Sequence, residues 1–381
     1  MSGAALCASM SIDELLRYAA KYGASDLHIT VGNPPIIRVN GRLKKIPGPA
    51  LSAEDSQLLL YSILTDEQRG AVEQRRELDL SYTWGTAAPA GSVVIEYTTP
   101  ERVRARVNVF MDLSGVGGAF RIIPAKIRTL EELPAPESVA ELTRCTTGLV
   151  LVTGPTGCGK STTLASMIDL IDQERQDRII TIEDPIEYIF KGQNCLISQR
   201  EIGAHSRSFA DALRACLRED PNVIFVGEMR DLETIQLALT AAETGHLVLS
   251  TLHTNNVAQT VDRVIDVFPA DQHDYVRQIF ANVIRGIISQ TLLPRKDQRG
   301  RVAAMEVLIC TPAVKNMIRE SKSHQVASLV QTGSQHGMQT MDQCLGMLLR
   351  KQLISIETAH SVATDKKLFA PPEMSAQPGT R

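Results

Sequence analysis

The sequence predicts an α/β fold in which a small α+β domain precedes a larger domain of parallel strands joined by helices. Short strand patterns and helical patterns alternate irregularly over the first third of the chain. From Leu149 onward, short apolar runs alternate with helical patterns, which is typical of parallel strands joined by crossovers. Between Gly154 and Thr162 the chain reads G-P-T-G-C-G-K-S-T, the pattern of a phosphate-binding loop between a strand and a helix.

The length and composition are those of a two-domain chain with a slightly acidic balance. With 381 residues the chain can form two or three cores of ordinary size, and two is our working number. The 40 Lys and Arg against 43 Asp and Glu give a net charge of -3, which argues against a broad electrostatic grip on nucleic acid. The 7 cysteines form no C-x-x-C pair, so we expect neither bound zinc nor a disulfide framework.

The sequence shows no pattern of a membrane anchor. No apolar stretch approaches the roughly 20 residues that a membrane-spanning helix needs, and the first residues lack the basic start of a signal peptide. We therefore expect a cytoplasmic protein. Met10 is a candidate start residue, and residues 1–10 are expected to be a disordered extension.

The first domain is predicted over residues 11–124. Its first helix begins at a capping box in which Ser11 is the N-cap and Glu14 reaches back, and it ends at Gly23. Asn40-Gly41 between two alternating runs is typical of a hairpin turn. A single helix is expected near residues 52–75. The predicted strands are 27–30, 36–39, 78–83, 93–98, 103–110 and 118–123.

The second domain is predicted over residues 137–368, after a linker at 125–136 that contains Pro134 and Pro136. Its predicted strands are 149–152, 179–182, 223–226 and 247–251. After residue 257 the pattern becomes helical, with helices expected at 276–288, 312–320 and 341–349. The proline-containing residues 369–381 are predicted to be a disordered tail.

The glycine-rich loop predicts a nucleoside triphosphate as ligand. Its glycines permit positive φ, so that successive backbone N–H groups converge on phosphates. Lys160 adds a positive charge, Ser161 offers a hydroxyl to Mg²⁺, and the following helix presents its positive end. The cofactors expected are ATP and Mg²⁺. The predicted nucleotide-binding residues are Gly154, Pro155, Thr156, Gly157, Cys158, Gly159, Lys160, Ser161 and Thr162.

Three polar clusters follow at the ends of later predicted strands, where ligands bind in an open α/β sheet. The first holds Glu183 and Glu187, either of which can position a water for attack on the γ-phosphate. In the second, Glu228 ends an apolar strand, as a Walker B acid does when it holds Mg²⁺ through water. The third places His246 and His253 on either side of a strand, as a γ-phosphate sensor or an intersubunit contact.

The glycine-rich loop and the three clusters, in this order, resemble the elements of the secretion ATPases of type IV pili and type II secretion. These enzymes are a RecA-like branch of the P-loop NTPases. The resemblance implies that Glu187 is the catalytic carboxylate and Glu228 the Walker B acid. It also implies that His246 and His253 form the His box of the family. A RecA-like ATPase core, a PAS-like N-terminal domain and a hexameric ring are further implications of the resemblance.

In this family the N-terminal domain lends arginines to the bound nucleotide. Arg106 and Arg121 match the positions of those arginines, although their context alone indicates only exposed strand residues. An arginine that acts on the transition state accelerates phosphoryl transfer by ~10³ to 10⁵. The resemblance therefore adds both residues to the predicted catalytic set.

Two features point to the pilus-retraction branch of the family. Members that drive assembly or secretion usually carry a tetracysteine zinc insert, and no two cysteines here are close enough in sequence to form one. The segment A-V-K-N-M-I-R-E at 313–320 resembles the A-I-R-N-L-I-R-E signature of retraction motors. The resemblance thus implies a homohexamer at the inner-membrane pilus machine that couples ATP hydrolysis to retraction and twitching motility. Its implied partners are a platform protein of that machine and a paralogous retraction ATPase.

The N-terminal domain departs from the family at two places, and several alternatives remain open. Retraction motors commonly carry N-Q-N-R-G where this chain has Asp112-Leu-Ser114-Gly115, and the segment 84–99 is longer than usual. One alternative is a motor of the same fold that drives pilus assembly or type II secretion. A second is a RecA-like nucleic-acid translocase, which the acidic balance disfavours. A third is a regulator that binds ATP without appreciable turnover.

Overall fold

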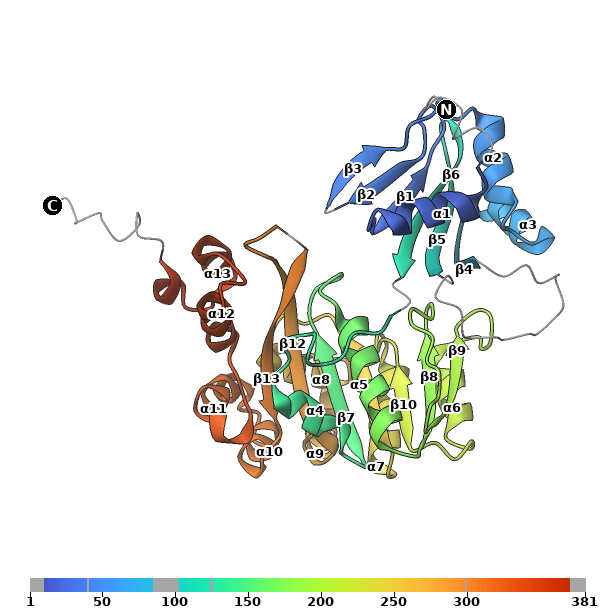
Figure 1. The fold of residues 1–381 in the computed structure, drawn as a ribbon. Helices are drawn as coiled ribbons and strands as arrows, with labels where there is room; N and C mark the ends of the chain where they lie inside the picture. The colour runs from blue at the N-terminus through green and yellow to red at the C-terminus, as the bar shows by residue number, and fades with distance from the viewer. Residues whose placement is uncertain (1–9, 40, 85–102, 124–125, 299, 371–381) are drawn as a thin grey trace. The chain divides into compact units, whose positions relative to one another are not determined.

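The computed structural model describes residues 10–39, 41–84, 103–123, 126–298 and 300–370. The chain divides into two compact units (Figure 1). One comprises Met1–Lys126 with Pro185–Ile189, and the other comprises Ile127–Asp184 and Phe190–Arg381. The strand predicted at 93–98 lies outside the described residues. None of the helices seen in these ranges is both long and apolar enough to cross a membrane.

The first unit is an antiparallel sheet with helices packed on one face. Its elements are α1 (Ile12–Lys21), β1 (Asp26–Ile29), β2 (Ile36–Val39), β3 (Arg42–Lys45), α2 (Ala53–Tyr61), α3 (Asp66–Arg75), β4 (Glu77–Trp84), β5 (Val103–Asp112) and β6 (Gly115–Ile123). The strand order within the described chain is β3-β2-β1-β6-β5-β4. Alternate strand residues such as Leu27, Val107 and Phe120 are buried and share one core with the helices.

The capping box and the hairpin predicted at the start of the first unit are confirmed, but the prediction of one helix near residues 52–75 is wrong. The capping box of Ser11 and Glu14 begins α1, and the β2–β3 hairpin places Gly41 at φ 80°. The single helix expected near residues 52–75 is instead two helices, α2 and α3. Thr65 begins the second one, because its hydroxyl accepts from the Gln68 N–H while the Gln68 side chain accepts from the Thr65 N–H.

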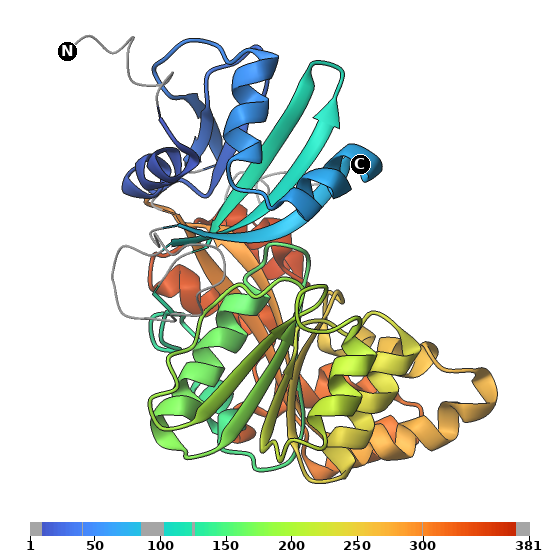
Figure 2. The same cartoon turned by 90° about the vertical axis from the view of Figure 1, so that its right-hand side faces the viewer.

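The second unit confirms the predicted α/β class. Its first elements are α4 (Glu137–Thr143), β7 (Gly148–Thr153), α5 (Lys160–Glu174), β8 (Arg178–Glu183), β9 (Leu196–Glu201), α6 (Phe209–Cys216), β10 (Val223–Val226), α7 (Leu232–Glu243) and β11 (Leu247–Leu252). Strands β7, β11, β10, β8 and β9 are neighbours in that order and run parallel. Figure 2 shows helices on both faces of this sheet, with α5 on one and α6 and α7 on the other.

The chain beyond β11 corrects the helical prediction in that region. The helix expected at 276–288 ends at Val283, and two unexpected strands follow, of which the first pairs in parallel with β7 and the second antiparallel with the first. Pairing with a buried strand suits the β-branched Ile284, Ile287 and Ile288. The elements are α8 (Val257–Asp266), η1 (Ala270–Gln272), α9 (His273–Val283), β12 (Ile284–Pro294), β13 (Arg301–Ile309), α10 (Pro312–Arg319), η2 (Ser323–Gln325), α11 (Val326–Thr332), η3 (Ser334–His336), α12 (Met341–Arg350), α13 (Ile356–Val362) and η4 (Lys366–Phe369).

One residue of the predicted disordered tail lies in a helix. We expected the tail from residue 369, yet Phe369 ends η4 and is only 6% exposed. Its ring packs in a small core with α12, α13 and β13 residues, because an aromatic side chain of that size gains from burial. Residues 371–381 lie outside the part of the chain that the structure describes.

Candidate functional site

The phosphate-binding loop lies between the buried strand β7 and the first turn of α5. Gly154, Gly157 and Gly159 have φ of 140°, 78° and 95°, a region that side-chain-bearing residues rarely adopt. A Cβ on Gly154 would lie 2.2 Å from the carbonyl oxygen of Gln290 in β12. The loop therefore has the backbone shape that a phosphate cradle requires, and its glycines are needed to keep that shape.

Lys160 places its ammonium group over this loop. Its Nζ donates to the carbonyl oxygens of Gly154 at 2.8 Å and Pro155 at 3.3 Å, and it lies 3.4 Å from Nδ1 of His253. Ser161 follows in the first turn of α5 and is half-buried. Charge, hydroxyl and helix N-terminus thus meet at one place, as binding of a polyphosphate with its Mg²⁺ requires.

His253 connects the loop lysine with the acid that follows β10. Its Nε2 lies 3.0 Å from Oε1 of Glu228, and the other oxygen of Glu228 lies 2.8 Å from the Arg230 guanidinium. Both contacts fit a neutral imidazole in which Nε2 donates to the carboxylate and Nδ1 accepts from the ammonium of Lys160. A proton on Nδ1 would instead face the ammonium. These distances bring the predicted Walker A lysine, Walker B acid and second histidine into one cluster.

The charge state of Glu228 is set by opposing effects. Partial burial raises the pKa of its carboxyl group, while the hydrogen bond and the charge of Arg230, together with His253, lower it. The effects of Arg230 and His253 outweigh that of burial. The pKa of Glu228 therefore lies below its ordinary value, and the side chain is a carboxylate at neutral pH. An ionised acid at this point can hold a hydrated Mg²⁺.

Gly227 stands where the commoner Walker B pattern has an Asp, and its surroundings leave little room for a side chain. A Cβ on Gly227 would lie 3.2 Å from the carbonyl oxygen of Ile182 and 3.3 Å from Cα of Glu183. The N–H of Gly227 donates to Ile182 at 2.7 Å, and the Thr251 hydroxyl donates to the Gly227 carbonyl at 2.6 Å. A side chain at this position would therefore require the backbone of β8 to give way by a few tenths of an ångström.

The acidic cluster after β8 divides between the two units. Glu183 is only 6% exposed, and its Oε1 accepts from the Thr181 hydroxyl at 2.7 Å and from the Gln199 amide at 3.3 Å. These two hydrogen bonds hold the Glu183 side chain within the sheet, at the end of β8. Glu187 falls in Pro185–Ile189, which groups with the first unit. The assignment of Glu187 as the catalytic carboxylate stays a prediction.

His246 is not brought to the cluster. It precedes β11, whereas His253 follows it, and a strand of that length separates its two ends by about 20 Å. The Nδ1 of His246 lies 2.9 Å from the Ala241 carbonyl and 3.3 Å from the Thr244 hydroxyl, at the end of α7. Of the two roles predicted for His246, this position leaves only an intersubunit contact, which stays a prediction.

The two predicted arginines lie side by side in the first unit. Arg106 on β5 and Arg121 on β6 are register partners, so their exposed side chains share one face of the sheet. The Nε of Arg121 lies 3.2 Å from Asp26 on the next strand. At the other end of β5, Asp112 explains the altered loop between β5 and β6, because its carboxylate accepts from the N–H groups of Ser114 and Gly115. The action of the arginines on a nucleotide stays a prediction.

Gln290 is a residue of the candidate site that was not predicted from the sequence. This residue is only 2% exposed and contacts the phosphate-binding loop from β12. Its Nε2 donates to the Cys158 carbonyl at 2.8 Å, and its Oε1 accepts from the Thr163 hydroxyl at 2.8 Å. No local motif marks Gln290, and the segment around it was predicted to be helical, so only strand pairing reveals the contact.

The residues fit a nucleotide whose metal ion is held largely by non-protein groups. Over the described ranges, no three His, Cys, Asp or Glu side chains gather in a way that could hold a metal ion. Mg²⁺ prefers to keep several waters and to bind phosphate oxygens with one or two protein ligands. Ser161, with Glu228 acting through water, would supply that small protein share.

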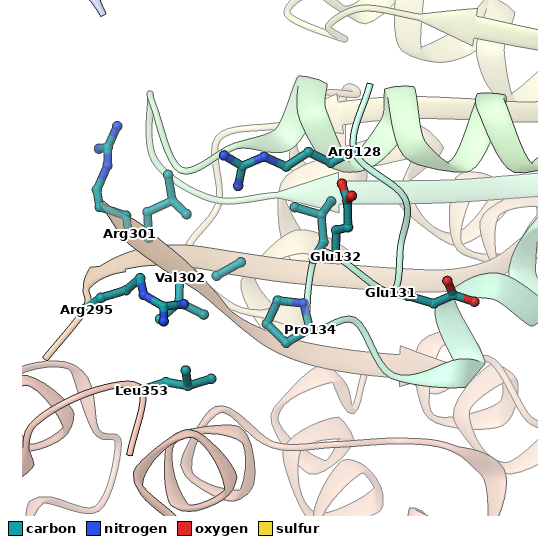
Figure 3. Close-up of a pocket in the computed structure, with 11 residues that line it drawn as sticks. Arg128, Glu131, Glu132, Pro134, Arg295, Arg301, Val302 and Leu353 are labelled. Carbon is teal, nitrogen blue, oxygen red and sulfur yellow. The ribbon is translucent and has the colours of Figure 1, made fainter. Parts of the chain in front are cut away.

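A separate hollow of about 280 Å³ lies between the segment before α4 and the β12–β13 hairpin (Figure 3). Arg128, Arg295 and Arg301 line it together with Glu131 and Glu132. None of the predicted site residues lines this hollow. We place the nucleotide at the loop, because the ammonium, the hydroxyl and the positive-φ glycines are there.

Comparisons with known proteins show the family of the chain. The model of the family described as "Type II/IV secretion system protein" matches residues 128–357. The chain is 49% identical to the "Type IV pilus retractation ATPase PilT" of Pseudomonas aeruginosa, over 93% of this chain and 98% of that protein. It is 46% identical to a "Twitching motility protein" of Neisseria gonorrhoeae, over 95% and 93%. A crystal structure of the pilus retraction motor PilT with bound ADP superimposes with a TM-score of 0.82 at 46% identity, covering 94% of this chain and 99% of that one.

Proposed function

The chain belongs to the family of type II/IV secretion system proteins, and from this premise we propose that it is a motor ATPase that powers retraction of a type IV pilus. One observation carries the ATPase assignment: His253 lies between the Lys160 ammonium and the Glu228 carboxylate, at 3.4 and 3.0 Å. The direction of work follows from the similarity to a retraction ATPase along nearly the whole of both chains.

Each residue of the cluster has a chemical task in this proposal. Backbone N–H groups of the loop and the Lys160 ammonium bind the phosphates and neutralise their charge. Glu187 orients the attacking water, and Glu228 holds the hydration shell of Mg²⁺. The metal, when bound, supplies charge stabilisation on the phosphate oxygens. Arg106 and Arg121 complete the site only when the units close on it, which couples chemistry to movement.

The segment that indicated the retraction branch forms an ordinary amphipathic helix with a tethered polar side. In α10, Val314 and Ile318 are buried. Lys315 Nζ lies 3.4 Å from the backbone carbonyl of Asn282, and an Arg319 nitrogen lies 2.7 Å from the Asn282 side chain. These contacts dock α10 on the end of α9. A retraction-specific role of this segment rests on resemblance, and its packing alone explains the apolar spacing.

We further propose that the motor is a homohexamer at the cytoplasmic face of the inner membrane. A platform protein of the pilus machine would receive its movement there. The support for this assembly is the resemblance to secretion ATPases and the similarity to the Pseudomonas retraction ATPase.

An ATPase assay tests the enzymatic part. Lys160→Ala and Glu228→Ala should each abolish turnover, because one removes the phosphate-binding charge and the other the acid that faces it. Lys351→Ala and Glu243→Ala, at exposed positions of the same unit, are the controls and should hydrolyse ATP normally. Near-normal hydrolysis by either site variant would overturn the assignment.

The phenotype of a deletion strain tests the direction of work. Loss of a retraction motor leaves cells piliated but unable to twitch. Loss of an assembly motor leaves them bald, and that result would transfer the chain to the assembly alternative. Stimulation of the ATPase by single-stranded nucleic acid, lost at higher salt, would instead revive the translocase alternative.

A further inference from the structure

We propose that Gln290 is a positioning residue that shapes the phosphate-binding loop for the β-phosphate of the nucleotide. The inference rests on the proposed function, since it assumes that the loop binds a nucleotide. Gln290 belongs to β12, a strand about 130 residues away in sequence from the loop, and it is buried to 2% exposure.

The strand pairing places Gln290 at the level of the loop. Ser289 is the register partner of Thr153, the last residue of β7. Gln290 therefore stands one step beyond the paired strands, where the chain of β7 turns into the loop. Its own backbone carbonyl lies against Gly154, close enough that a Cβ there would be 2.2 Å away. The backbone of this residue thus forms one wall of the loop entrance.

The side chain of Gln290 contacts the other end of the loop. Its Nε2 donates to the Cys158 carbonyl and its Oε1 accepts from the Thr163 hydroxyl, both at 2.8 Å. The amide orientation follows from its partners, because a carbonyl oxygen accepts only and must face the NH₂ group. A Cβ on Gly159 would lie 3.2 Å from the same Nε2. One side chain thus ties the loop to the first turn of α5.

The bond to Cys158 sets the direction of the next backbone N–H. In a trans peptide the C=O of Cys158 and the N–H of Gly159 point in opposite directions. Holding that carbonyl against β12 therefore turns the Gly159 N–H away from β12. Since β12 and Gln290 close one side of the loop, phosphate has access from the other side, which the N–H faces. Gln290 would preorganise this donor before the nucleotide arrives.

The inference is tested by measuring ADP binding to Gln290→Met and Gln290→Glu in the full-length protein. Methionine keeps the volume but makes neither bond, and glutamate keeps an acceptor for Thr163 but places a carboxylate against the Cys158 carbonyl. Gln339→Met is the matched control, because Gln339 donates a similar amide bond to the Met305 carbonyl, at 2.9 Å, away from the loop. ADP and AMP affinities are measured by calorimetry, and unfolding temperatures without nucleotide.

We expect both Gln290 variants to raise the dissociation constant of ADP by about tenfold to a hundredfold, because the loop would then have to be ordered when ADP binds, at a cost of the order of the lost hydrogen bonds. The affinity for AMP, which has no β-phosphate, should fall much less. The Gln339 control should lower the unfolding temperature without changing ADP affinity.

If one Gln290 variant fails to fold, the other variant decides the test. ADP binding within twofold of the wild type in a folded variant, or equal losses for ADP and AMP, overturns the inference. A wild-type protein that binds no ADP would overturn the proposed function instead.

Discussion

At the scale of single residues, the site is a line of four polar side chains. Lys160, His253, Glu228 and Arg230 follow one another at distances of 3.4, 3.0 and 2.8 Å. An ammonium on one side and a carboxylate on the other favour the tautomer of the His253 imidazole that carries its hydrogen on Nε2. The line links the phosphate-binding loop to the end of β10.

The pH dependence of hydrolysis should respond to Arg230. Arg230 is the strongest influence lowering the Glu228 pKa against the upward effect of burial. In Arg230→Gln the pKa of Glu228 should rise, so that its carboxylate becomes protonated at a higher pH. The acidic limb of the curve of kcat against pH should therefore move to higher pH. The shift is moderated by solvent, because the Arg230 side chain is 68% exposed. Arg230→Lys keeps the charge and should leave the limb nearer to that of the wild type. A limb that stays in place in Arg230→Gln contradicts this account of Glu228.

The two histidines of the predicted His box should differ in their effect on turnover. His253→Ala removes the group between the lysine and the acid, and we expect kcat to fall by about 10²-fold, the lower end for a group positioned in a reaction site. His246→Ala serves as its control, because the His246 imidazole lies against the end of α7, at the other end of β11 from His253. Steady-state ATPase rates of the two variants decide. Equal loss in both would show that His246 acts on the site from a position in the assembled ring.

At the scale of elements, local signals determine where helices begin, and tertiary pairing determines where strands extend. The capping boxes at Ser11 and Thr65 both begin helices. The second was overlooked in the sequence because helical residues continue on both sides of it. The strand β12 carries no comparable local mark, and its β conformation is determined by pairing with β7 and β13. The central strands of the second unit were therefore predictable from the sequence, whereas β12 was not.

The break between α2 and α3 should depend on the Thr65 side chain. Thr65→Ala removes the acceptor for the Gln68 N–H and should lower the free energy of unfolding by about 1 kcal/mol, the usual cost of a lost N-cap. Thr65→Ser keeps the hydroxyl and should stay near the wild type. Chemical denaturation followed by circular dichroism measures both. Equal stability of the alanine and serine variants would show that packing alone positions α3.

The close approach of strands around Gly227 predicts a second stability effect. Gly227→Ala places a methyl group 3.2 Å from the Ile182 carbonyl oxygen and 3.3 Å from Cα of Glu183, so backbone must shift and we expect a loss of about 1 to 3 kcal/mol. Gly70→Ala is the matched control, since nothing lies within 4 Å of its Cβ in helix α3. The control should be neutral or stabilising by up to ~1 kcal/mol. Thermal unfolding of both variants measures the difference. An unaffected Gly227→Ala would show that the edge of the sheet adapts, and that Asp is absent there for another reason.

At the scale of the whole molecule, the residues predicted to act in catalysis are distributed between the two units. The loop, Glu228 and His253 belong to the second unit, while Arg106 and Arg121 belong to the first. If the arginines act on a nucleotide held by another subunit, hydrolysis requires the assembled ring. Turnover per subunit would then rise with protein concentration until assembly is complete.

Mixing of inactive variants tests this distribution. The double variant Arg106→Ala with Arg121→Ala should lose most of kcat, consistent with the ~10³ to 10⁵ that such arginines contribute, while still binding ADP. Mixed with Lys160→Ala subunits, it should regain part of its activity, because the mixed ring pairs an intact loop with intact arginines. ATPase rates of mixtures at constant total protein measure the recovery. No recovery after subunit exchange would place the arginines on the nucleotide of their own chain.

The sequence by itself determined the class of fold, the phosphate-binding loop and the order of the acidic and histidine clusters. Those features are local, because a glycine pattern or a cap is encoded within a few neighbouring residues. The tertiary structure decided the rest. It brought His253 but not His246 to the loop, turned Glu183 inward under hydrogen bonds, and set Gln290 against Cys158 from a distant strand. The contact of His253 with Lys160 joins residues 93 positions apart, and that of Gln290 with Cys158 joins residues 132 positions apart, so only the pairing of strands determines that they meet.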